Sequence, residues 1–152
     1  MLVRVSACYR RADEIIGPAP YSRMRYSYGG GHPGFGPSFG ILQDTHVLGE
    51  DCSGFASDVL HAGGILSIPA AKRAIDTEEF LRYGRPGAGK WLTVHVRNDP
   101  DPAGVHHMRL DFHGHPEFTH RYCEAPHDGA FVQWLDGEPD FTGYIARHWP
   151  GA

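Results

Sequence analysis

Apolar residues recur at helical spacing in the first half of the chain. Residues 5–16 (VSACYRRADEII) predict a short helix that stops at Gly17. Residues 76–81 predict another, with Asp76 as its N-cap. Residues 19–50 show neither a helical nor a strand period and are rich in Gly, Pro, Tyr and Phe. We expect a long structured loop there, and loops of that length inside a compact domain usually have a function.

The clearest helix is predicted over residues 51–62. Its apolar side chains follow Cys52 at intervals of three and four, which is the spacing of one buried helix face. Asp51 is a natural N-cap, and Gly63-Gly64 supply a left-handed stop. We expect the serines, the aspartate and the histidine of this helix to form its opposite, polar side, and Cys52 to face the body of the protein.

The second half of the chain alternates apolar and polar residues in short runs between turn residues, as strands do. The predicted strands are KWLTVHV (90–96), HHMRLDF (106–112), EFTHRY (117–122), AFVQWL (130–135) and FTGYIARH (141–148). Because helices come first and strands follow, we predict an α+β fold with N-terminal helices packed on an antiparallel sheet. The length, 152 residues, suits a single domain over 1–152.

Composition and charge exclude several classes of protein. Apolar residues make up 41% of the chain and charged residues 21%, which is typical of a globular domain. The net charge is −4 and there are only two lysines, so we expect no nucleic-acid partner. No apolar run is long enough to span a membrane, and no signal peptide is expected. An odd number of cysteines, three, implies no disulfide framework.

Two motifs resemble ligand-binding sites but lack features that such sites need. GRPGAGK (84–90) has the spacing of a phosphate-binding loop but lacks the Ser or Thr that should follow, and a strand rather than a helix comes next. The histidines of HH (106–107) and HGH (113–115) do not reproduce the usual structural-zinc spacings. We therefore expect no metal and no cofactor.

The position of Cys52 suggests chemistry. The first N–H groups of a helix have no intrahelical acceptors, and the helix dipole is positive there. Both effects favour a thiolate, so we expect the pKa of Cys52 to fall and the same N–H groups to be able to hold an oxyanion. A Cys in this position can equally be an inert packing residue.

Four segments of the chain resemble the NlpC family of papain-like bacterial cell-wall endopeptidases. RYSYGGGH (25–32) is similar to the aromatic-Gly-Gly segment before the nucleophile, and DCSGFASDVLHAGGIL (51–66) to the nucleophile helix. GKWLTV (89–94) and FTGYIARHWPGA (141–152) resemble a phage and actinobacterial branch of the family. The resemblance implies a papain-like fold, with Cys52 as nucleophile and Tyr26 lining the site beside the oxyanion.

In the family, the general base is a His at the start of a strand. His107 fits the family pattern, in which apolar residues follow at +1, +3 and +5. His106 is the alternative, because alternation along a strand places it on the same face as those apolar residues. The family spacing of apolar residues favours His107, and the alternation of side chains across the strand favours His106.

The family's third catalytic residue lies on the next strand. His120 is the candidate in this sequence, one position beyond the commonest family spacing from His107, and that spacing taken strictly selects Thr119. Its role would be to fix the tautomer of the base.

The resemblance implies a cysteine peptidase or amidase that hydrolyses amide bonds of peptidoglycan stem peptides, next to D-glutamate. It also implies a place in a phage tail or a lysin, within a larger polypeptide, or in a secreted cell-wall protein. Two alternatives remain: a catalytically inactive wall-binding module, and a transacylase on the same scaffold.

Overall fold

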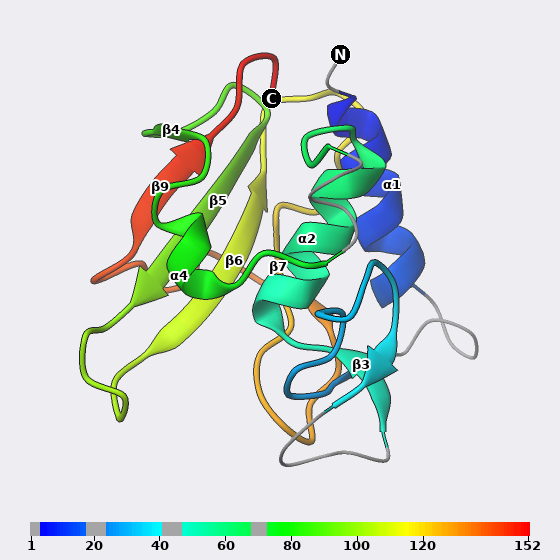
Figure 1. Ribbon diagram of the computed structural model, residues 1–152. Coiled ribbons are helices and arrows are strands. Elements are labelled where there is room, and N and C mark those ends of the chain that lie inside the picture. The colour runs from blue at the N-terminus through cyan, green and yellow to red at the C-terminus, as the bar shows by residue number, and fades with distance from the viewer. Residues whose placement is uncertain (1–3, 18–23, 41–46, 68–72) are drawn as a thin grey trace.

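Two helices pack against one face of an antiparallel sheet (Figure 1). The computed structural model describes residues 4–17, 24–40, 47–67 and 73–152. Helix α1 (Val5–Ile16) lies beside α2 (Cys52–Ala62), and α2 contacts the sheet directly. Among the described residues no helix is long and apolar enough to cross a membrane. The predicted α+β fold, with N-terminal helices packed on an antiparallel sheet, is confirmed.

The large sheet has six strands in the order β4-β9-β5-β6-β7-β8, and every neighbouring pair is antiparallel. Its long central hairpin joins β5 to β6 with Asn98 opposite His106 and Leu92 opposite Phe112. The strands are β4 (Arg85–Pro86), β5 (Leu92–Asn98), β6 (His106–Phe112), β7 (Tyr122–Glu124), β8 (Gln133–Leu135) and β9 (Ile145–His148). The short helix α4 (Thr77–Phe80) lies against the end of this hairpin.

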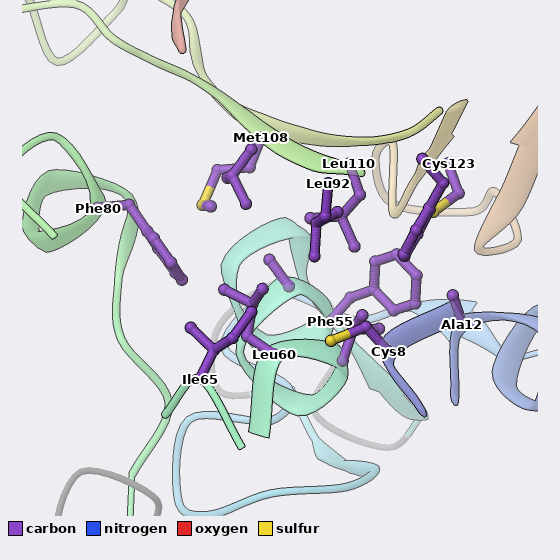
Figure 2. Packing of buried hydrophobic residues seen from close by; sticks show 14 of the residues in the cluster. Cys8, Ala12, Phe55, Leu60, Ile65, Phe80, Leu92, Met108, Leu110 and Cys123 are labelled. Carbon is purple, nitrogen blue, oxygen red and sulfur yellow. The ribbon is translucent and has the colours of Figure 1, made fainter. Parts of the chain in front are cut away.

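The core forms between α2 and the sheet (Figure 2). Met108 and Leu110 of β6 meet Phe55 and Leu60 of α2, and all four are almost completely buried. Phe80 of α4 is buried at one end of this layer. The even-numbered residues of β6 therefore face the helices, because side chains alternate across a strand.

Helix α2 is buried on all sides, which differs from the predicted amphipathic helix. Ser57 exchanges hydrogen bonds with the backbone of Ile75, and Asp58 accepts two hydrogen bonds from Arg11 of α1. The predicted polar side is thus covered by α1 and by the chain before α4. The burial of Ser57 and Asp58 is thus compensated by specific hydrogen bonds, whereas Nδ1 of His61 is buried without a partner among the described residues.

The glycine-rich segment packs on the first turn of α2. It belongs to a small sheet in which β3 (Leu48–Glu50) lies between β1 (Arg25–Tyr26) and β2 (Ser38–Phe39). A Cβ at Gly54 would lie 2.1 Å from the carbonyl oxygen of Gly30, so only glycine permits this approach. The GGGH run therefore forms a wall against the first turn of α2.

The helices agree closely with the sequence prediction, and some strand boundaries do not. The segment 117–121 is not a strand, and β7 begins only at Tyr122, because Tyr9 of α1 binds the backbone N–H groups of Thr119 and His120. Those N–H groups are then not available to a sheet ladder. Residues 141–144 form a turn, and β9 covers only the end of the predicted strand.

Candidate active site

Cys52 is the first residue of α2, and its thiol is almost fully buried against β6. The Asp51 side chain caps the helix by accepting the Gly54 N–H at 2.7 Å, and the Asp51 carbonyl accepts the Phe55 N–H. The N–H groups of Cys52 and Ser53 have no backbone acceptor within the described segments. The local sequence thus places a sulfur beside two donors that remain available.

Burial raises the pKa of the Cys52 thiol to about 12, and the charge of Asp51 adds to the effect. The Thr77 hydroxyl, 3.9 Å from the sulfur, and the backbone N–H groups of Met108 and Ser53 act in the opposite direction but are outweighed. This contradicts the expectation of a lowered pKa. The helix N-terminus does stabilise negative charge, but desolvation of a buried thiol is the larger effect. The resting cysteine is therefore a neutral thiol.

Cys52 opens into a cavity of about 740 Å³. The first half of the chain contributes the lining residues Tyr26, Tyr28, Gly29, His32, Asp51, Cys52 and Ser53. Helix α4 and the β5–β6 turn contribute Asp76, Thr77, Glu78, Asn98, Asp99, Pro100, Pro102 and His106. A cavity of this size, with a thiol and polar groups at its wall, is suited to hold a short peptide.

The structure places His106, rather than His107, on this cavity. His106 shares the face of β6 that carries Met108, whose backbone N–H lies against the Cys52 sulfur. His106 and Cys52 therefore line the same cavity. Its Nδ1 is 2.7 Å from Asn98 Oδ1, and its Nε2 is 3.2 Å from the carbonyl oxygen of Asp101.

His107 projects from the opposite face of the sheet. Its Nε2 is 2.6 Å from Glu124 Oε2, and the same oxygen accepts a hydrogen bond from Arg109 at 2.8 Å. Burial acts against the charge of Glu124, but these two hydrogen bonds hold its pKa below the usual value. His107 is thus held in an ion-pair cluster and is not among the residues that line the cavity, and its role as general base stays a prediction.

Thr119 and His120 lie at the far end of β6. Thr119 bonds to the Tyr9 hydroxyl at 3.1 Å, and His120 stacks on Trp134 with ring centroids 5.1 Å apart. The neighbouring Arg121 pairs with Phe112, six residues from His106, a separation of about 20 Å along the strand. The structure therefore brings neither candidate third residue to either histidine.

Tyr26 lies on the cavity wall. Strand β1 holds it parallel to Glu50 of β3, immediately before Asp51 and Cys52. Burial, together with the negative charges that Cys52 and Asp51 can carry, raises the pKa of its phenol. The hydroxyl keeps its proton and can donate a hydrogen bond into the cavity.

Among the cavity residues that were not identified from the sequence are Asn98 and Thr77, and His32 was named only as part of the segment 25–32. Asn98 was detectable in principle, because extending the hairpin of the two long strands to the histidine pair places it opposite His106. Thr77 has no sequence signal beyond its position after an N-cap. His32 follows three glycines that bend toward α2, and only the folded chain shows that its ring reaches Asp51.

Comparison with solved structures shows that the fold is shared with P60 domains. The peptidoglycan hydrolase RipB of Mycobacterium tuberculosis aligns over 94% of this chain and 63% of its own, with 22% identity and a TM-score of 0.63. A point mutant of the resuscitation-promoting-factor-interacting protein RipA aligns over 95% of this chain and 61% of its own, with 21% identity and a TM-score of 0.64. The P60 domain of an M. avium paratuberculosis antigen aligns over 94% of this chain and 90% of its own, with 18% identity and a TM-score of 0.63.

The chain spans somewhat less than two thirds of the RipB and RipA chains. No protein-family model and no curated protein sequence matches it. The resemblance to the NlpC type that the sequence predicted is confirmed as a shared fold.

Proposed function

We propose that this domain is a cysteine peptidase or amidase that hydrolyses amide bonds in peptidoglycan peptides. The main support is that Cys52 and His106 line the same cavity and that Asn98 is hydrogen-bonded to the imidazole of His106. A thiol, an imidazole and an orienting amide are the groups of a Cys-His-Asn peptidase. The shared fold with RipB, a peptidoglycan hydrolase, supports the substrate class.

His106 is the proposed general base, in place of His107. Because the resting thiol is neutral, the reaction begins with transfer of its proton to the imidazole as the sulfur attacks the carbonyl carbon. The Nε2 of His106, which contacts the Asp101 carbonyl at rest, has to turn toward the sulfur for this step. The amine leaves with the proton from the imidazolium, and water then hydrolyses the thioester.

Asn98 is the proposed third residue. It lies on β5 directly opposite His106, so it holds Nδ1 and leaves Nε2 for the proton transfer. The expected third residue on the following strand, His120 or Thr119, is replaced in this role by a residue on the preceding strand. The first-turn N–H groups of α2 and the hydroxyl of Tyr26 are the proposed oxyanion donors.

The substrate expected from the sequence is a stem peptide cut next to D-glutamate, and a place in a phage tail, a lysin or a secreted wall protein is part of the same proposal. A second candidate function is that of a wall-binding module without chemistry. The raised pKa of Cys52 and the engagement of both ring nitrogens of His106 favour it, since neither group is activated at rest. A transacylase would use the same groups with an amine in place of water.

Digestion of purified peptidoglycan followed by mass spectrometry tests the proposal. The native protein should release fragments with new amino and carboxyl ends, and Cys52→Ala, which keeps the fold, should release none. Equal, complete absence of fragments from both proteins would favour the binding module. Fragments joined to an added amine would identify a transacylase.

A further inference from the structure

A second histidine, His32, lies in the Cys52 cavity and takes no part in the proposed chemistry. It follows the glycines that pack on α2, and its side chain is 25% exposed. Its Nε2 is 2.8 Å from Asp51 Oδ1 and 3.0 Å from the Ser53 hydroxyl. The ring is therefore fixed at one nitrogen by the residues on either side of the nucleophile.

The partner of Nε2 determines which ring nitrogen remains for a ligand. The Asp51 carboxylate, at the N-terminus of α2, also accepts hydrogen bonds from the N–H groups of Gly54 and Gly29. A carboxylate only accepts, so His32 Nε2 must carry a hydrogen in either charge state. Nδ1 has no hydrogen-bond partner in the part of the chain that the structure describes.

The charges around the ring favour its protonated form. Burial lowers the pKa of His32, but the bond to Asp51 and the charges of Asp51, Asp76 and Glu79 outweigh it and raise the pKa above the usual value. Asp99 and Glu78 add further carboxylates to the wall, and the described lining contains no Lys or Arg. A protonated ring turns Nδ1 from an acceptor into a donor.

We propose that His32 is a substrate-binding residue, which donates an Nδ1–H hydrogen bond to an uncharged carbonyl of the peptide bound beside Cys52. A free carboxylate fits this position poorly, because its charge would add to those of Asp51 and Asp76, which already balance the ring. The third carboxylate, Glu79, is paired with Arg73. The inference deepens the proposed hydrolase function and rests on it. It narrows the substrate class: the D-glutamate residue next to the scissile bond would carry a carboxamide in place of its free carboxylate.

Two variants separate this role from a purely structural one. His32→Gln keeps an amide nitrogen near the position of Nε2, so Asp51 retains its donor while the Nδ1 group is lost. His32→Asn carries its amide nitrogen near the position of Nδ1 and leaves Asp51 without its donor. We expect His32→Gln to melt like the native protein, and His32→Asn to melt at a lower temperature.

The decisive experiment uses two synthetic stem peptides that differ only in a carboxamide or a carboxylate beside the scissile bond. The native protein should show the lower KM for the carboxamide, and His32→Gln should raise that KM about tenfold, as the loss of a hydrogen bond to a charged group does. In the native protein that KM should also rise with pH as the ring loses its proton, and in His32→Gln it should not. A KM unchanged by His32→Gln, or a native preference for the carboxylate, would overturn the inference.

Binding of the same peptides to Cys52→Ala, measured by calorimetry, keeps this test independent of turnover. If the native protein cleaves neither peptide, the hydrolase proposal fails. The effect of His32→Gln on carboxamide binding in the Cys52→Ala background then decides the role of His32 alone, with about tenfold weaker binding supporting it and equal binding refuting it.

Discussion

Replacing His107 by alanine should weaken the fold and leave the chemistry in place, whereas replacing His106 should do the reverse. His107 is 13% exposed and donates to Glu124, which is 8% exposed, over 2.6 Å. Loss of a hydrogen bond to a charged group costs roughly 1.5–3 kcal/mol. Because Glu124 keeps its hydrogen bond from Arg109, we place the cost near the lower end, about 1.5 kcal/mol.

For a protein of this size that cost corresponds to a fall in Tm of about 3–6 °C. His107→Gln is the matched control, since an amide can still donate to Glu124 and should recover much of the loss. The exposed His106 contributes little packing, so His106→Ala should change stability by no more than about 0.5 kcal/mol. Its turnover should fall by a factor of about 10² or more, because the general base is gone.

Calorimetric melting and peptide hydrolysis, measured on all three variants, make the comparison. The assignment is refuted if His107→Ala melts like the native protein but is inactive while His106→Ala stays active. That outcome would restore the register predicted from the family pattern. If both alanine variants stay active, neither histidine is the base.

Two further predictions follow from single contacts. Asn98→Ala should lower kcat about tenfold or more at nearly constant KM, and an unchanged kcat would remove Asn98 from the mechanism. Asn98→Asp should move the acid limb of the pH profile to higher pH, because a carboxylate raises the pKa of the adjacent imidazole. Glu50 is fully buried, and its burial and the neighbouring Asp58 raise the pKa of its carboxyl group. The native protein should therefore lose stability as the pH rises above the pKa of Glu50 in the unfolded chain, near 4.5. The loss is at most about 1.4 kcal/mol per pH unit. Glu50→Gln should therefore be the more stable protein at pH 8 in urea unfolding, and equal pH slopes of the two proteins would contradict the buried, protonated carboxyl.

The sequence predicts the helices well because their signals are local. An apolar stripe, an N-cap and a terminating glycine all lie within the segment 51–64, and α2 begins and ends where these signals place it. The position of Cys52 at the helix start follows from the same signals. The pKa of its thiol does not, because burial depends on β6 and α4, which come later in the chain.

The strands after residue 112 were predicted less accurately, and the physical reason is competition for backbone N–H groups. The run 117–122 alternates as a strand does, but a tyrosine 110 residues earlier in the chain binds the N–H of Thr119. No window of local sequence contains that contact. The third-residue candidates were placed on this run, and the structure locates them about six strand positions from His106.

The choice between His106 and His107 depends on the alternation of side chains along β6 as well as on the family motif. Family register selected His107, and the alternation of Met108, Leu110 and Phe112 selected His106. In the structure those three side chains are buried against the helices, so the histidine of the same parity reaches the cavity. The apolar pattern shows which face of the strand meets the helices, and so which histidine reaches the cavity. Which of the two is the general base stays a prediction.

The most direct test of the account is to ask whether Cys52 forms a thioester that water resolves. Stem peptide is mixed with the protein in heavy-oxygen water, the reaction is stopped by acid within the first turnover, and the intact protein and the products are weighed. We predict an acyl adduct on Cys52 in the native protein, no adduct in Cys52→Ala, and a released carboxylate that contains one oxygen from the labelled water. Cleavage by Cys52→Ala at the native rate, or binding of the peptide by the native protein without adduct or cleavage, would contradict it.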